Sequence, residues 1–372
     1  MKRATAIVTE KGGRTSHAAI VSRELGIPAV VGAENACKIL QHQSIISVNG
    51  TTGEVFKGSI VHHHRGDKEE IKPKAKHLKT LTKIYVNLAE PEAAHKIAAL
   101  DVDGIGLLRA EFMIAGIGTH PKEFIQNGKQ EIFIEKLTSN LLKFVKPFHP
   151  RQVVYRATDF KTNEYKNLAG GKKFEPHEEN PMLGFRGAYR YIVNPDVFGL
   201  ELQAIRRVWQ AGYNNLHLMI PFVRTPWELI KIKDIVKQYG MFDLIGFKLW
   251  IMVEVPSCAL NLKEYIDLGI DGVSIGTNDL TMMLMGVDRD NENVAPIYEE
   301  RTPIVEKVLE DIVRTCHDNG VTCSICGQAA SDYPELVEKL VKAGITSVSI
   351  SPDAIDRTRE LIFNIEKKHF TK

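Results

Sequence analysis

The chain has 372 residues, of which 44% are hydrophobic and 25% charged, with a formal net charge of +2. This length suits about two domains, and the small net charge gives no basis for binding nucleic acid or a membrane surface. No apolar run approaches the roughly 20 residues that span a bilayer, and five cysteines are too few for a disulfide framework, so we expect a reduced, cytoplasmic protein.

Residues 1–61 are predicted to form a small mixed α/β unit. Glycines separate short apolar runs that begin near Ala6, Ile27, Ser44 and Gly53, and these runs are typical of short strands. The stretch HAAIVSREL (17–25) instead places apolar residues at helical spacing, and the glycine that follows is a suitable helix end.

His17 opens this predicted helix, directly after the sequence GGRTS. The free N–H groups at a helix start favour an anion, and a neutral imidazole is a competent nucleophile towards phosphorus. A lone histidine is usually structural, but two preceding glycines, Arg14 and Thr15 favour a phosphoryl carrier here.

Residues 62–80 (HHHRGDKEEIKPKAKHLKT) have almost no apolar content and many charges, as an interdomain linker would. The three histidines at its start also suggest metal binding, but we favour a solvated linker.

Residues 81–372 are predicted to form a (β/α)₈ TIM barrel. Eight short β-like runs occur at 83–88, 103–108, 152–157, 217–223, 248–255, 271–277, 322–327 and 347–351, most of them separated by segments of helical length and pattern. The long stretch 157–216 between the third and fourth runs is interpreted as an insertion at the rim.

Catalytic side chains of such barrels lie at the C-terminal ends of the strands. In chain order those ends carry Arg109, Arg156 with Asp159, Arg224, Glu254, Asn278 with Asp279, Cys326 and Ser351. Arginines, separated acids and a cysteine on one mouth indicate a site for a small anion and a divalent metal.

Glu254 and Asp279 follow adjacent strands, so they can share one hard cation, and Mg²⁺ fits two carboxylates completed by substrate and water oxygens. The alternative is that each acid pairs with a nearby arginine. The clustering at one mouth favours the metal.

Arg109, Arg156 and Arg186 suit a substrate with both carboxylate and phosphate groups, because the guanidinium fork binds such oxygens in pairs. Ordinary salt bridging is the alternative for any one arginine. For Arg224, the sequence does not decide between substrate binding and a structural role.

Cys326 makes a CxxC with Cys323, which raises the possibility of a zinc site with Cys316. Residues three apart on a strand point to opposite faces, and Cys316 belongs to the preceding helix, so we do not favour zinc. Cys326 is instead predicted to act as an acid–base, with its thiolate favoured by nearby cations. For Cys323 and Cys258 a buried, inert thiol is expected.

Several long motifs resemble the phosphoenolpyruvate-utilising enzymes. GGRTSHAAIVSRELGIPAVVG is similar to their swivelling phosphohistidine domain, which the resemblance leads us to expect in an N-terminally incomplete form. GIGLLRAEF, MVEVPS, SIGTNDLTMMLMGVDRD and CGQ are similar to their barrel, which binds phosphoenolpyruvate (PEP) and pyruvate. The resemblance covers essentially the whole chain.

The resemblance implies a role for each matching residue. His17 would carry the phosphoryl group, and Cys326 would move the proton at the methyl or methylene carbon. Mg²⁺ would bind to Glu254 and Asp279. Substrate contacts would come from Arg109, Arg156, Arg186, Asn278 and Arg289.

YRATDFKTNEY, HEENPMLGFRGAYRY and CGQ are similar to the pyruvate, water dikinase-like branch, which converts ATP, pyruvate and water to AMP, PEP and phosphate. Nothing in the chain resembles the family's ATP-grasp region, so ATP would need a separate region or subunit. The alternatives are a carrier that passes phosphate from PEP to a protein, as the first enzyme of the sugar phosphotransferase system does, or a non-catalytic assembly or regulatory subunit. A homodimer is expected from the resemblance.

Overall fold

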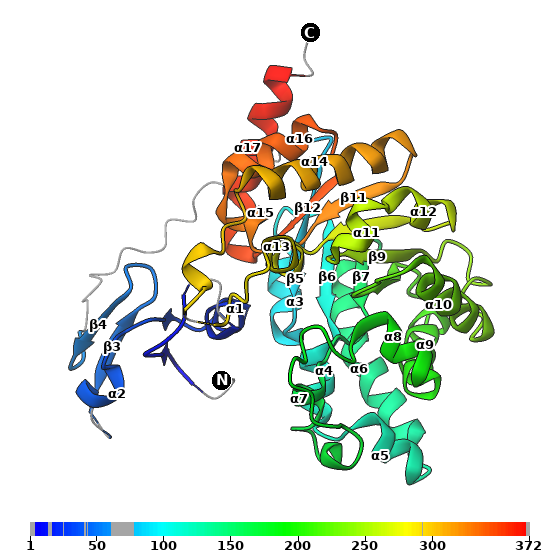
Figure 1. Ribbon diagram of the computed structural model, residues 1–372, viewed down its shortest axis with the longest axis horizontal. Coiled ribbons are helices and arrows are strands. Elements are labelled where there is room, and N and C mark those ends of the chain that lie inside the picture. Colours follow the sequence, from blue (N-terminus) through cyan, green and yellow to red (C-terminus); the bar gives the residue numbers. More distant parts are fainter. Residues whose placement is uncertain are drawn as a thin grey trace. The chain divides into compact units, whose positions relative to one another are not determined.

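The structure of the chain is a computed structural model that describes residues 4–13, 17–24, 26–40, 42, 44–60, 78–291 and 293–369. They divide into two compact units (Figure 1). The first unit spans 1–79 with 285–299, and the second spans 80–284 with 300–372. Most of the predicted linker, residues 62–77, lies outside the described residues. No helix in the described ranges is long and apolar enough to cross a membrane.

The first unit contains two small sheets. The parallel sheet pairs β1 (Ile7–Val8) with β2 (Ala29–Val30), and the antiparallel sheet pairs β3 (Ile46–Asn49) with β4 (Glu54–Lys57). Its helical elements are α1 (His17–Glu24), α2 (Ala36–Ile39) and the 3₁₀ turn η3 (Ala295–Ile297). The predicted apolar runs therefore form strands.

Helix α1 begins at His17, as the sequence pattern predicts. At its other end Gly26 has a positive φ of 65°, which a residue without a Cβ adopts at little cost. The N–H of Ile27 then donates to the carbonyl of Ser22 at 2.9 Å, which satisfies a carbonyl in the last turn.

The second unit is a closed barrel of eight parallel strands in the order β10-β11-β12-β5-β6-β7-β8-β9. The strands are β5 (Lys83–Leu88), β6 (Gly104–Arg109), β7 (Gln152–Arg156), β8 (Leu216–Ile220), β9 (Leu249–Val253), β10 (Gly272–Ile275), β11 (Thr322–Ile325) and β12 (Ser347–Ile350). Each falls on one of the eight predicted runs, which confirms the (β/α)₈ prediction.

A helix returns the chain after every strand, and Figure 1 shows these helices around the strands. They are α3 (Ala94–Ala98), α6 (Gln130–Phe148), α9 (Pro195–Gln210), α10 (Pro226–Gln238), α12 (Leu262–Asp267), α14 (Pro303–Asp318), α16 (Pro334–Lys342) and α17 (Ile355–His369).

Shorter helices lie in the connections that follow the C-terminal ends of the strands. These are α4 (Ala110–Ile117), α5 (Pro121–Gln126), α7 (Thr162–Tyr165), α8 (Gly187–Val193), α11 (Pro256–Leu260), α13 (Thr277–Met285) and α15 (Ala329–Asp332), with 3₁₀ turns η1 (Pro91–Ala93), η2 (Gly171–Lys173) and η4 (Pro352–Ala354). The insertion predicted at 157–216 holds α7, η2, α8 and the regular barrel helix α9.

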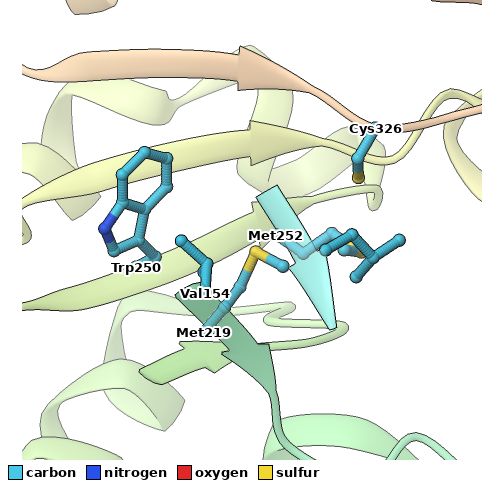
Figure 2. Packing of buried hydrophobic residues seen from close by; sticks show 6 residues of the cluster. Val154, Met219, Trp250, Met252 and Cys326 are labelled. Atoms are coloured by element: carbon cyan, nitrogen blue, oxygen red, sulfur yellow. The ribbon is translucent and has the colours of Figure 1, made fainter. Parts of the chain in front are cut away.

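A buried cluster fills part of the barrel interior. Its members are Leu107, Val154, Met219, Trp250, Met252 and Cys326. Figure 2 shows these side chains converging from several strands, with Trp250 and Cys326 on opposite sides of the labelled group. Cys326 therefore packs in the barrel interior and lies just beyond the C-terminal end of β11.

Candidate active site at the barrel mouth

Three carboxylates meet at the C-terminal mouth of the barrel. Asp159 follows β7, Glu254 directly follows β9, and Asp279 lies in the first turn of α13 after β10. One oxygen from each lies within 4.8 Å of the others, and this trio is the one group of potential metal ligands found among the described residues. The sequence placed all three at the mouth but assigned only Glu254 and Asp279 to a metal.

Glu254 is held in place by the backbone beside it. Its Oε1 accepts a hydrogen bond from the N–H of Phe222 at 2.8 Å, and the side chain is buried. Burial raises its pKa to about 8, with further upward contributions from Asp279 and Asp159. Such mutual repulsion between buried carboxylates is relieved by a bound cation, and hard carboxylate oxygens are the donors that Mg²⁺ prefers. The residues present therefore fit a divalent cation.

Arg186 bridges two members of this trio. Its Nε donates to Asp159 Oδ1 at 3.0 Å, its Nη2 also bonds Asp159 Oδ2, and the same Nη2 donates to Asp279 Oδ2 at 2.9 Å. The guanidinium is buried and lies over the ring of Phe222, 4.0 Å from its centroid. Burial disfavours the charged form of Arg186, but Asp159 and Asp279 together outweigh burial, and the pKa of Arg186 rises well above its ordinary value.

Arg224 supports Arg186 through the backbone. Its Nη2 donates to the carbonyl of Gly184 at 2.7 Å and its Nη1 to the carbonyl of Arg186 at 3.3 Å. The same guanidinium lies 3.6 Å from Glu228 Oε1. These contacts favour the structural role for Arg224, the choice that the sequence left open.

Arg156 lies at the end of β7 and is paired with an acid that the sequence reasoning missed. Its Nη2 donates to Glu111 Oε1 at 3.0 Å, and its Nη1 approaches Met252 Sδ at 3.7 Å. The surrounding carboxylates raise its pKa above the ordinary value even though burial opposes this. Glu111 stands two residues after Arg109 on α4, and that closeness to a predicted site residue was the one available signal.

Arg109 and Asn278 also lie at strand ends around the mouth. Arg109 is the last residue of β6, and Asn278 is in the first turn of α13. The Oδ1 of Asn278 accepts a hydrogen bond from the N–H of Gln328 at 3.2 Å, which ties α13 to the loop that follows Cys326.

Cys326 is buried, and its Sγ lies 3.5 Å from the carbonyl of Ile275. Its own carbonyl accepts a hydrogen bond from Asn87 Nδ2 at 3.0 Å. Burial raises the pKa of the thiol to about 11, although Ser274, Arg156 and Arg109 lower it. The cations are therefore present as expected, but burial outweighs them and Cys326 rests as a thiol.

The zinc arrangement considered for the other cysteines is not found in the described part of the chain. The thiol of Cys323 hydrogen-bonds Cys316 on α14, which raises its pKa, whereas Cys326 packs in the barrel interior. Cys258 is a buried free thiol.

The two remaining predicted site residues belong to the first unit. His17 is the first residue of α1, and its side chain is outside the described structure. Arg289 lies in the segment 285–299, which groups with the first unit. The geometry of the mouth described above therefore includes neither residue.

Two family models match the chain. The model of the PEP-binding domain of PEP-utilising enzymes matches residues 64–367, and that of their mobile domain matches residues 1–53. A structural comparison finds RipC from Yersinia pestis with a TM-score of 0.42 and 10% identity, covering 76% of this chain and 94% of that one.

Curated relatives are similar over the whole chain. A probable phosphoenolpyruvate synthase of Staphylothermus marinus is 46% identical over 100% of this chain and 46% of that protein. The phosphoenolpyruvate synthase of Pyrococcus furiosus is 45% identical over 99% of this chain and 46% of its own length, and that of Pseudomonas aeruginosa is 41% identical over 95% and 48%. The chain thus spans about half the length of these relatives. With a family model matching residues 64–367, the chain belongs to the PEP-utilising enzymes.

Proposed function

We propose that the chain transfers a phosphoryl group between His17 and pyruvate or PEP bound at the barrel mouth. The observation that carries this proposal is the trio Asp159, Glu254 and Asp279, set among the arginines of a barrel that matches the PEP-binding domain. A phosphorylated carboxylic acid needs guanidinium groups that bind its anionic oxygens and carboxylates that bind the cation accompanying it.

Arg109, Arg156 and Arg186 would bind the carboxylate and phosphate oxygens of the substrate. Arg186 would exchange its present partners, Asp159 and Asp279, for the phosphoryl oxygens. Asn278 would contact the phosphoryl group, and Arg289 would complete the set from its own segment.

Asp159, Glu254 and Asp279 would hold Mg²⁺ with one carboxylate oxygen each. When bound, Mg²⁺ supplies positive charge where the enolate oxygen of the substrate becomes negative. Glu254 keeps its orientation through the N–H of Phe222, so the site is partly organised in advance.

From PEP, the bond between phosphorus and the enol oxygen breaks while a bond from phosphorus to a ring nitrogen of His17 forms. The thiol of Cys326 then gives its proton to the methylene carbon, which yields pyruvate and a thiolate that regains a proton from water. A thiol with a pKa of about 11 is in the right form for this direction. In the reverse direction the thiolate removes a methyl proton of pyruvate.

The domain arrangement belongs to this proposal. Residues 1–61 would form the phosphohistidine domain, and residues 62–80 would be the linker that lets it swing to the barrel of residues 81–372. The high charge and low apolar content of residues 62–80 are the composition of an interdomain linker.

Radiolabelled PEP tests the proposal directly. Incubated with PEP labelled on phosphorus and with Mg²⁺, the wild-type chain should acquire acid-labile label, as a phosphohistidine does. His17→Ala should acquire none. An unlabelled wild-type chain, or full labelling of His17→Ala, would refute the central claim.

Cys326→Ala separates the two chemical steps. Its methyl-proton exchange with pyruvate, followed by NMR in D₂O, should stop, while calorimetry should still detect PEP binding. Exchange at the wild-type rate would remove Cys326 from the mechanism.

We also propose that the chain takes part in the phosphoenolpyruvate synthase activity after which its relatives are named. ATP would phosphorylate His17 only through an ATP-grasp region, and the test is AMP formation from ATP and pyruvate with and without such a region added. A homodimer is a further expectation from the family, which sedimentation velocity tests, and a cytoplasmic location is the expectation from the low cysteine content.

A further inference from the structure

The segment that links Arg156 to Asp159 leaves the barrel sheet within two residues. The N–H of Ala157 still donates to the carbonyl of Met219 on β8 at 3.0 Å. The next two N–H groups, of Thr158 and Asp159, turn to side-chain carboxylates instead. The positions of Arg156 and Asp159 therefore depend on the two acids that accept these N–H groups, Glu201 and Glu111.

One of the two acids, Glu111, touches the site itself. Its Oε1 accepts the N–H of Asp159 at 2.6 Å and also the Nη2 of Arg156 at 3.0 Å. It therefore joins both ends of the segment 156–159.

The other acid, Glu201, lies on α9, outside the ring of strands. Its Oε2 accepts the N–H of Thr158 at 3.1 Å and the hydroxyl of Tyr155 at 2.6 Å. The carbonyl of Thr158 is bonded in turn by the hydroxyl of Tyr191 on α8. These groups are all buried, so Thr158 is held through both its N–H and its carbonyl.

Burying the carboxyl group of Glu201 at this position is energetically unfavourable. It is 1% exposed, no cation is among the groups that shift its pKa, and burial raises that pKa to about 7. Burying an acid without a cation is unfavourable, so a neutral side chain would serve a merely structural purpose at lower cost. An acidic acceptor is useful where a backbone N–H must be held strongly.

We propose that Glu201 is a positioning residue for the mouth, which acts through Tyr155 and the backbone of Thr158 to fix where Arg156 and Asp159 lie relative to each other. The proposal rests on the proposed function, in which Arg156 binds the substrate and Asp159 faces the cation. Glu201 itself touches neither.

The test compares the rate of label transfer from PEP to His17 at saturating PEP in the full chain. Glu201→Ala should lower this rate by about 100-fold, since displacing a site residue by about 1 Å has an effect of that size. Glu201→Gln keeps a carbonyl oxygen as acceptor but a weaker one, so its rate should lie between those of wild type and Glu201→Ala. Tyr155→Phe removes a single donor and should slow transfer by about tenfold or less.

Glu175 offers a matched control. It is a buried glutamate of the same insertion, and its carboxylate is bound by Arg190 and His120 rather than by the segment 156–159. Glu175→Gln should lower the melting temperature and leave the transfer rate unchanged. A stability loss without a rate loss in Glu201→Ala, or an equal rate loss in Glu175→Gln, would overturn the inference.

If Glu201→Ala does not fold, Tyr155→Phe decides, and a wild-type rate in that variant overturns the inference. If the wild-type chain takes no label, the proposed function fails on its own, and PEP affinity in the presence of Mg²⁺ becomes the readout. Calorimetry should then show about tenfold or greater weakening in Glu201→Ala, and unchanged affinity would overturn the inference.

Discussion

Glu201 makes the stability of the protein depend on pH in an unusual direction. Burial raises its pKa from 4.5 to about 7, so the folded chain binds this proton more tightly than the unfolded chain does. Its contribution to the free energy of unfolding is therefore fully present below pH 4.5 and is lost as pH rises through 7.

Glu201→Gln cannot ionise and should escape this loss. We subtract the free energy of unfolding of wild type from that of Glu201→Gln at each pH. This difference should be larger at pH 8 than at pH 5, by up to about 3 kcal/mol. Urea unfolding of both proteins at the two pH values measures the difference. The same relative stability at both values would contradict a raised pKa for this residue.

Some residues of the site could be predicted from the sequence, and others could not. Strand ends identified Arg156, Glu254 and Asp279, because a barrel brings those ends to one mouth. Glu201 carries no such signal, since a glutamate within a helix pattern is usually solvated. The protonation state of Cys326 was also out of reach, because burial and nearby cations shift the pKa in opposite directions and only the packing decides between them.

At the scale of elements, the start of α8 is fixed against the end of β8. The N–H of Ala188 donates to the carbonyl of Pro221 at 3.1 Å, and Arg186 is the N-cap residue of the helix. Gly187 has a φ of +61°, and a Cβ there would lie 2.4 Å from the Cβ of Phe222. Only glycine allows this close approach.

Gly187→Ala should therefore destabilise the protein and displace Arg186. We expect a loss of more than about 2 kcal/mol in the free energy of unfolding, together with weaker PEP binding, because strain and overpacking add. Gly212→Ala is the matched control, since Gly212 has a φ of +90° and a Cβ added there would meet nothing within 4 Å. It should show the smaller loss and normal binding, and equal losses in the two variants would argue against the steric explanation.

The eight strands were predictable because each is a short run rich in β-branched or aliphatic residues, and helix-forming segments separate most of these runs. The insertion after β7 was predictable only as a length. Its internal order comes from long-range polar contacts such as the pair of Arg190 with Glu175, which no local pattern reveals.

At the scale of the whole molecule, the convergence of Asp159, Glu254 and Asp279 predicts that a cation stabilises the fold. Because Mg²⁺ would bind the folded chain and not the dispersed carboxylates of the unfolded one, it should raise the melting temperature by a few degrees at millimolar concentration. Differential scanning calorimetry with and without EDTA measures the shift.

Asp279→Asn should reduce this shift, since it removes one of the three carboxylates. Asp267→Asn is its control, because Asp267 is an exposed acid that pairs with Lys263 on α12 and does not belong to the trio. An undiminished shift in Asp279→Asn would argue against a cation at the trio and favour the alternative in which Asp159 and Asp279 only pair with Arg186.

Four of the five cysteines, Cys258, Cys316, Cys323 and Cys326, are buried, and Cys37 on α2 is exposed. A maleimide dye added to the native chain should therefore attach at Cys37 and report from the first unit alone. A second dye placed on an exposed barrel helix would then turn the swing proposed for the phosphohistidine domain into a change in energy-transfer efficiency. The natural distribution of thiols thus leaves this protein ready for single-molecule fluorescence without the removal of any native cysteine.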